Sequence, residues 1–171
     1  MLITREELQF HKINVDHTYP AGAFDDHGHT FSQVEVLRVQ AVAEILESGI
    51  RILGSLSTRL EFACDRCAGF VDFPVLRNFD LLYRPMSTIA RAEEFELPES
   101  ELDVGFYGGA GVELEGLTRE QVILAVPMKK LCRPDCRGLC AICGANLNLA
   151  ACGCRETVID SPFAVLLGRI R

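Results

Sequence analysis

The sequence predicts an α+β protein: an antiparallel β meander body with short helices, followed by a cysteine-rich, zinc-binding C-terminal segment. Residues 50–62 and 71–83 alternate apolar and polar side chains, the period-2 pattern of half-buried strands. A short apolar helix ending at Pro127 precedes six cysteines crowded into residues 132–154. Paired thiols repeated within one short region suit a tetrahedral metal ion.

Residues 34–46 are ambiguous, because their apolar positions fit both an alternating strand and a helical stripe. Breaks at Ser48-Gly49 and at residues 64–69 separate this segment from the next two strands by short connections. Successive strands with short connections form an antiparallel meander. We therefore predict that residues 34–46 are the first of three such strands.

The remaining segments give weaker signals. Residues 1–33 are mixed and polar, and residues 84–111 resemble a long loop with an acidic run at 93–96 and a glycine-rich stretch at 105–111.

Two short helices are expected near the C-terminus. Thr118 is predicted as the N-cap of the first, which Pro127 ends, and Ser161 with Pro162 opens a last helix over 163–170. We divide the chain into a body, residues 1–127, and a tail, residues 128–171.

Length and composition indicate a globular cytoplasmic protein. With 171 residues, 49% of them hydrophobic, the chain can bury a core. The first ten residues contain acids where a secretory signal needs a basic start, and no run reaches the roughly 18 apolar residues of a membrane span. Thiols stay reduced in the cytoplasm, where clustered cysteines are metal ligands or redox groups rather than disulfides.

The net charge of −7 argues against a general nucleic-acid binder, but the charge is uneven. Residues 1–127 carry ten basic and 21 acidic residues, a balance of −11, whereas the residues from Lys129 onward carry seven and three, a balance of +4. An acidic body suits a basic protein partner, and a basic tail suits phosphate. A solvent-exposed surface with an uneven distribution of charge, and no charged partner, explains the same charge balances.

Eight cysteines are the candidate metal ligands: Cys64, Cys67, Cys132, Cys136, Cys140, Cys143, Cys152 and Cys154. We favour Cys140, Cys143, Cys152 and Cys154 as one zinc site, since Gly144 allows the chain to turn and residues 144–151 can close a loop around the ion. The other four would form a second site that joins body to tail. The cysteines could also be shared differently, so the sequence predicts one or two zinc ions.

Other chemistries fit the sequence less well. The cysteine spacings match no iron–sulfur signature. A redox Cys64–Cys67 pair would be expected in a βαβ unit rather than between antiparallel strands. A cysteine nucleophile needs a nearby base, and all four histidines lie within the first 29 residues, where His27 and His29 fit a polar turn better than a metal site.

No catalytic constellation is visible. The glycine-rich stretch at 105–111 lacks the lysine and the serine or threonine of a phosphate-binding loop, and the acids of residues 93–103 read as a solvated loop. We therefore expect no enzyme activity.

The cysteine motifs resemble those of one family. The pair CDRC at 64–67 is followed by QVILAVP at 121–127, CRPDCRGLC at 132–140, CGANLN at 143–148 and SPFAVL at 161–166. This combination resembles the bacterial YceD family (DUF177), the large ribosomal RNA subunit accumulation proteins. The resemblance extends from about residue 34 to the end, and the run from Gly138 to Asn148 is its most specific part.

The resemblance implies a non-enzymatic ribosome-biogenesis factor that promotes accumulation of large-subunit (23S) ribosomal RNA. The implied partner is a large-subunit ribosomal protein or a pre-ribosomal particle, and the basic tail would be the part that reaches rRNA. An RNA-binding zinc module acting directly on precursor rRNA is the alternative, and a redox protein using Cys64 and Cys67 is a third. Some family members lack most of the tail cysteines, which implies a structural role for the tail metal.

Overall fold

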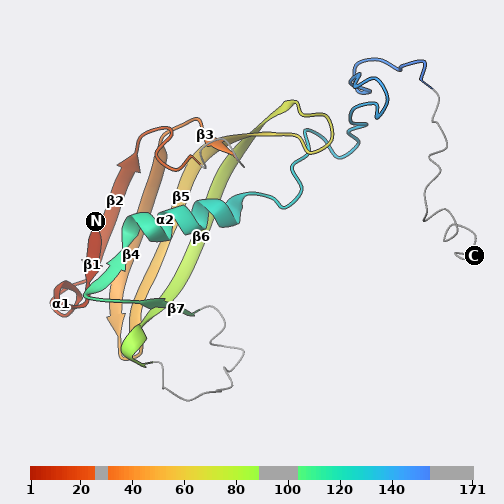
Figure 1. Ribbon diagram of the computed structural model, residues 1–171. Helices are drawn as coiled ribbons and strands as arrows, with labels where there is room; N and C mark the ends of the chain where they lie inside the picture. Colours follow the sequence, from red (N-terminus) through yellow and green to blue (C-terminus); the bar gives the residue numbers. More distant parts are fainter. Residues whose placement is uncertain (26–30, 89–103, 155–171) are drawn as a thin grey trace, which may run out of the picture.

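The computed structural model describes residues 1–25, 31–88 and 104–154, and its main feature is a long sheet with one helix lying across a face (Figure 1). The elements in chain order are β1 (Leu2–Thr4), α1 (Arg5–Leu8), β2 (Ile13–Tyr19), β3 (Ser32–Gln33), β4 (Leu37–Leu46), β5 (Gly49–Ala63), β6 (Phe70–Pro85), the short 3₁₀ helix η1 (Met86–Thr88), β7 (Val104–Tyr107), β8 (Gly111–Glu113) and α2 (Leu114–Ala125). The main sheet has the order β2-β4-β5-β6-β7, with β3 also paired to β5, and β1 pairs with β8 in a separate two-stranded sheet.

Strands β4, β5 and β6 form the predicted antiparallel meander. Their registers place Ala41 opposite Gly54 and Gly54 opposite Phe79. In β4, buried residues alternate with more exposed ones from Leu37 to Ala43, so the strand interpretation of this ambiguous segment is confirmed. The β5–β6 pair is the longest, and its closed end extends beyond α2 (Figure 1).

Residues 1–33 contain more structure than their composition suggests. Strand β2 pairs antiparallel with β4 along its whole length and forms an edge of the main sheet. Val15 is its only fully buried residue, and Ile13 and Tyr19 are partly buried against the core. Ile13, Val15 and Tyr19 fall on alternate positions, but the polar His17 interrupts the alternation, and the strand was not predicted from the sequence.

The prediction that residues 84–111 form one long loop is wrong in part. Strand β6 continues to Pro85, β7 runs parallel to it from Val104, and β8 begins at Gly111. A parallel pair needs a long crossover, and a four-residue strand carries little periodic signal. The acidic run at 93–96, the predicted helix at 163–170, and His27 and His29 lie outside the described residues.

Helix α2 begins one turn earlier than predicted. Glu113 is its N-cap residue, without a side-chain capping bond, and Leu114 is the first helical residue. Thr118, predicted as the cap, is fully buried inside the helix, where its hydroxyl donates to the Leu114 carbonyl at 2.7 Å. The helix ends at Ala125, two residues before Pro127, as predicted. Among the described residues, no helix is long and apolar enough to span a membrane.

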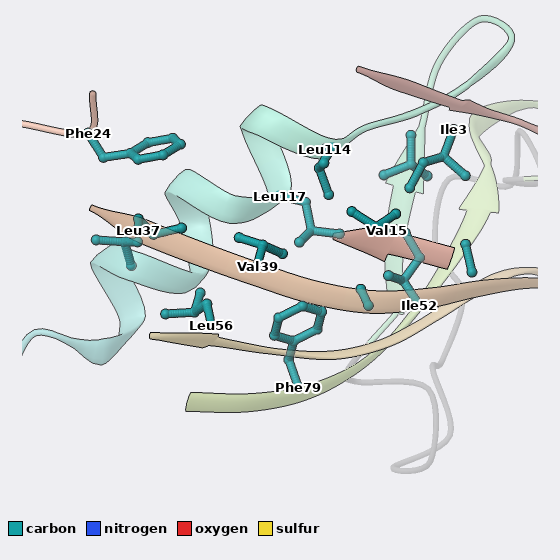
Figure 2. Close-up of a cluster of buried hydrophobic side chains, with 14 of the residues drawn as sticks. Ile3, Val15, Phe24, Leu37, Val39, Ile52, Leu56, Phe79, Leu114 and Leu117 are labelled. Carbon is teal, nitrogen blue, oxygen red and sulfur yellow. The ribbon is translucent and has the colours of Figure 1, made fainter. Parts of the chain in front are cut away.

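The core lies between α2 and the face of the sheet below it. Leu114 and Leu117 of the helix point toward Val15, Val39 and Ile52 of the strands (Figure 2). Further members of this core are Ile3, Phe24, Leu37, Leu56, Leu60, Phe62, Phe79 and Val122. The division of the chain into a body and a tail remains a prediction, but this core belongs entirely to residues 1–127.

Gly54 allows an unusually close approach at the centre of the meander. A Cβ atom at this position would lie 2.6 Å from the Gln40 carbonyl oxygen, 2.6 Å from the Ala41 Cβ and 2.8 Å from the Phe79 ring. The Phe79 ring therefore occupies the space above Gly54 on the core face. Any side chain at this position would displace the ring and a neighbouring backbone.

We expect Gly54→Ala to lower the free energy of unfolding by about 1–3 kcal/mol, the usual cost of overpacking a core. Urea unfolding followed by far-ultraviolet circular dichroism measures the change. Ser55→Ala is the matched control, because Ser55 lies on the opposite face and should change stability by less than about 0.5 kcal/mol. Equal stability of the two variants would contradict the packing described for Phe79.

Candidate metal centres

The first cysteine pair lies at the closed end of the β5–β6 hairpin. The Cys64 N–H donates to the Gly69 carbonyl at 2.8 Å and the Ala68 N–H to the Cys64 carbonyl at 2.9 Å. Ala68 has a positive φ of 57°, which turns the chain back into β6. The turn buries both thiols, leaving Cys64 3% and Cys67 8% exposed.

The segment after α2 docks on this turn through backbone and side-chain hydrogen bonds. The Asp65 N–H donates to the Lys130 carbonyl and the Lys130 N–H to the Asp65 carboxylate, each at 2.7 Å. Arg66 donates through Nη1 to the Cys136 carbonyl at 2.7 Å. Its own carbonyl accepts from the Leu139 N–H at 3.1 Å. The hairpin turn thereby brings a second set of cysteines toward the first.

Gly138 fits this contact because it has no side chain. It has a positive φ of 76°, and a Cβ atom there would lie 2.9 Å from the Arg66 carbonyl oxygen. Both the packing and the backbone conformation therefore require glycine at position 138.

Four sulfur atoms meet where the turn and the segment join. The Sγ atoms of Cys64, Cys67, Cys132 and Cys136, here called the hairpin cluster, all lie within 4.8 Å of one another. Cys64 and Cys136 are separated by 3.8 Å between sulfurs, and Cys67 and Cys132 by 3.7 Å. A zinc ion with Zn–S bonds of about 2.3 Å places its sulfur ligands about 3.8 Å apart. The hairpin cluster fits a tetrahedral ion in donor type and in spacing.

The other four cysteines form a second group, here called the tail cluster. The Sγ atoms of Cys140, Cys143, Cys152 and Cys154 also lie within 4.8 Å of one another. The Cys140 N–H donates to the Ala145 carbonyl at 2.8 Å, and the Gly144 N–H donates to the Cys140 carbonyl at 2.9 Å. This small turn brings Cys140 and Cys143 together. Cys143 and Cys154 are exposed, whereas three of the four hairpin-cluster thiols are buried.

Neighbouring N–H groups donate to several of the sulfurs. Cys64 Sγ accepts from the Cys132 N–H at 3.4 Å, and Cys140 Sγ accepts from the Ile142 N–H at 3.5 Å. Cys136 Sγ accepts from Asn148 Nδ2 at 3.3 Å. Donors of this kind surround metal-bound thiolates, because they stabilise negative sulfur. Both clusters could therefore hold a metal ion through four thiolates.

In the hairpin cluster, the surroundings favour one thiolate. Burial raises the pKa of Cys64, but N–H donors led by that of Cys132 outweigh it and bring the pKa down to about 6. The pKa of Cys132 is raised to about 12, first by its contact with Cys136 and then by burial. One sulfur of the cluster is thus negative at neutral pH before any metal binds.

The tail cluster also contains one thiol with a lowered pKa and one with a raised pKa. The N–H groups of Cys143 and Ile142 lower the pKa of Cys140 to about 6. The pKa of Cys154 is raised to about 12, chiefly by its contact with Cys143. Each cluster therefore starts with a thiolate that can receive a cation.

The structure groups the eight predicted ligands in the two sets of four that we favoured from the sequence. Their binding of metal stays a prediction. The Cys64–Cys67 pair lies between antiparallel strands, which is not the βαβ setting that a redox pair would be expected to have. Asn148, Asp65 and Arg66, whose backbone and side-chain groups support the clusters, were not predicted from the sequence. Asn148 could have been noticed as a polar residue in the middle of the loop between two cysteine pairs.

Comparison with known proteins identifies a family and several relatives of this chain. Residues 52–168 match the family described as "Large ribosomal RNA subunit accumulation protein YceD", a range that includes all eight cysteines. An uncharacterized protein of Mycobacterium tuberculosis and another of Mycobacterium bovis are each 31% identical over 138 residues, covering 77% of this chain and 58% of the relative.

Plant relatives carry the family name. A Zea mays protein named large ribosomal RNA subunit accumulation protein YCED homolog 1, chloroplastic, is 25% identical over 132 residues, covering 62% of this chain and 44% of the relative. The chain thus spans about half the length of the curated relatives it matches. The comparison with solved structures found no match. The family match covers more than half of the chain, and the chain belongs to the YceD family of large ribosomal RNA subunit accumulation proteins.

Proposed function

We propose that this protein is a non-enzymatic ribosome-biogenesis factor that promotes accumulation of large-subunit (23S) ribosomal RNA by binding a ribosomal protein or a pre-ribosomal particle. The observation that carries this proposal is the family match over residues 52–168. The proposed place of action is the cytoplasm, where thiols stay reduced; the plant relatives are named chloroplastic.

Two zinc ions are the proposed cofactors, one in each cysteine cluster, with all eight cysteines as ligands. Four thiolates and no free coordination position are typical of structural rather than catalytic zinc. The two cysteine pairs of the hairpin cluster lie 65 to 72 positions apart in the chain. Their proposed role is to fasten the segment after α2 to the sheet, which gives the protein one fixed binding surface.

The charge of the body supports a basic partner. Residues 1–127 have a balance of −11, from ten basic and 21 acidic residues. Glu113, Glu115 and Glu120 are exposed along α2. The pKa of Tyr83 is raised to about 12, first by burial and then by the negative charge of Glu120. A surface of this sign attracts the basic surface of a ribosomal protein.

An RNA-binding module is the second candidate, favoured by four basic residues within positions 129–137: Lys129, Lys130, Arg133 and Arg137. The charge of the metal sites opposes it, however. Four thiolates and one divalent ion carry a net charge of about −2, so that two sites contribute about −4. That charge offsets the +4 of the residues from Lys129 onward, seven basic against three acidic. We therefore place protein binding ahead of RNA binding.

Metal content tests the proposed cofactor directly. We expect about two zinc ions per chain in the purified protein, and about one in Cys140→Ser, because four-coordinate zinc loses a ligand that it requires. Residues 132–154 should also become more susceptible to proteolysis in this variant. Inductively coupled plasma mass spectrometry measures the metal, and Ala141→Ser serves as the matched control. Unchanged zinc in Cys140→Ser would remove Cys140 from the ligand set.

Proton release during zinc binding tests the two lowered thiol pKa values. A lowered pKa favours the thiolate, so Cys64 and Cys140, each with a pKa of about 6, are already deprotonated at about pH 7 in metal-free protein. Of the four thiols in each cluster, at most three then have a proton to lose. Below about pH 6 the fourth proton must also leave, and zinc affinity should fall more steeply with decreasing pH.

Calorimetric titration in buffers of different ionisation enthalpy counts these protons. A count of four per ion at about pH 7 would show that neither thiol is deprotonated beforehand, whereas a pH-independent affinity would argue against thiolate ligands altogether.

Purification of the tagged protein from its own cells tests the partner. We expect large-subunit ribosomal proteins to co-purify and to remain bound after ribonuclease treatment. Protein mass spectrometry and RNA sequencing of the eluate read the result. Binding that ribonuclease abolishes and that weakens steeply with salt would favour the RNA-binding candidate, and an eluate with neither ribosomal protein nor precursor rRNA would contradict the proposal.

A further inference from the structure

We propose that Asn148 couples the two metal sites, so that filling the tail cluster strengthens metal binding at the hairpin cluster. This inference rests on the proposed zinc sites. It assigns to Asn148 a positioning role that the ligand sets alone do not reveal.

Asn148 lies in the middle of residues 144–151, the loop that joins the two cysteine pairs of the tail cluster. Its side chain nevertheless contacts the other cluster: Nδ2 donates to Cys136 Sγ, a proposed ligand of the hairpin cluster, at 3.3 Å. Its Oδ1 accepts from the Arg137 N–H at 2.8 Å and from Arg133 Nη2 at 2.9 Å. One amide thus joins a loop of one cluster to a sulfur and the flanking backbone of the other.

The position of this amide depends on the tail cluster. Cys143 and Cys152 stand at the two ends of the loop, and their sulfurs lie within 4.8 Å of each other. Inside the loop, Asn146 Oδ1 accepts from both the N–H and Nδ2 of Asn148, and the Leu147 N–H donates to the Gly138 carbonyl outside the loop at 2.9 Å. With a metal bound, Cys143 and Cys152 hold the loop closed. Without it, closing the loop costs conformational entropy before Asn148 can reach Cys136.

The donated hydrogen bond acts on the charge of the sulfur. Cys136 is 2% exposed, so the N–H donor of Asn148 at 3.3 Å stabilises a negative sulfur that water cannot reach freely. Groups that hydrogen-bond to metal ligands typically change metal affinity 10- to 100-fold when removed. Coupling between two binding sites is reciprocal. A metal at the hairpin cluster should therefore raise the affinity of the tail cluster by the same factor.

The difference in exposure between the two clusters predicts the order in which a chelator removes the two ions. Cys143 and Cys154 are exposed, while Cys64, Cys67 and Cys136 are buried. A chelator in solution reaches the tail cluster first. Loss of that metal would release the loop and weaken the buried site, so the two ions should leave in sequence rather than independently.

A double-mutant cycle tests this proposal. Four full-length proteins are compared: the wild type, a tail-cluster knockout (Cys152→Ser with Cys154→Ser), Asn148→Leu, and the combination of all three substitutions. Competition with a chromophoric zinc chelator gives the zinc affinity of the hairpin cluster in each. We expect the knockout to lower that affinity about 10-fold or more when Asn148 is present, and to have little further effect in Asn148→Leu. Leu149→Ala is the control, because this neighbouring side chain is 85% exposed and should change neither affinity.

A second measurement keeps all eight ligands in place. In protein loaded with ¹¹³Cd, Asn148→Leu should shift the resonance of the hairpin cluster and leave that of the tail cluster nearly unchanged, since Asn148 donates to the sulfur of Cys136 in the hairpin cluster. This measurement does not use the knockout, so it remains valid even if the knockout disorders the segment of the tail cluster.

Three results would overturn the coupling. The knockout could leave the hairpin-cluster affinity unchanged, it could lower it equally with and without Asn148, or the ¹¹³Cd resonance of the hairpin cluster could stay in place in Asn148→Leu. In each of these cases the wild type still binds two ions, so the proposed zinc sites survive. A wild-type protein that binds no metal would overturn both proposals together.

Discussion

The contact between the tip of the β5–β6 hairpin and the segment after α2 is the constraint on which the rest of the structure depends. It brings Cys64 and Cys67 to cysteines 65 to 72 positions away in the sequence, and bringing such distant residues together costs chain entropy. Backbone hydrogen bonds between Asp65 and Lys130 and between Arg66 and Leu139 offset part of this cost. A metal held by all four thiols would contribute most of the remainder, since binding energy at such a site is also folding energy.

The sheet makes this contact possible because its β5–β6 hairpin extends beyond the apolar core. The apolar cluster under α2 is built from β2, β4, β5 and β6 with Leu114 and Leu117 of the helix (Figure 2). The β5–β6 pairing continues beyond this core to Ala63 and Phe70, and the chain leaving α2 runs toward the same end (Figure 1). The sheet is thus a scaffold that presents two cysteines at a fixed place. The acidic helix face and the cysteine-rich segment are then held in one arrangement, as the proposed binding role requires.

The parts of the fold that sequence reasoning found share a strong local signal, and the parts that it missed depend on distant partners. The alternation in β5 and β6 and the stop at Pro127 are local, so the meander and the end of α2 could be predicted. In β2 the polar His17 interrupts the alternation of Ile13, Val15 and Tyr19, and β7 has only four residues and pairs in parallel with β6, so both leave weak patterns in their own residues. Thr118 has the chemistry of an N-cap, but burial beneath the helix directs its hydroxyl back to Leu114. For the clusters, thiol spacing indicated the ligands, whereas the role of Asn148 follows only from seeing which sulfur its amide faces.

Zinc K-edge X-ray absorption on the purified protein tests the central claim, that four sulfurs surround each ion, most directly. Two tetrathiolate sites should give a shell of four sulfur atoms at about 2.3 Å with no nitrogen or oxygen contribution. Averaged over two sites, that result requires all eight cysteines as ligands. A shell containing nitrogen or oxygen, or fewer than four sulfurs per ion, would contradict the two tetrathiolate sites and with them the proposed attachment of the tail to the hairpin.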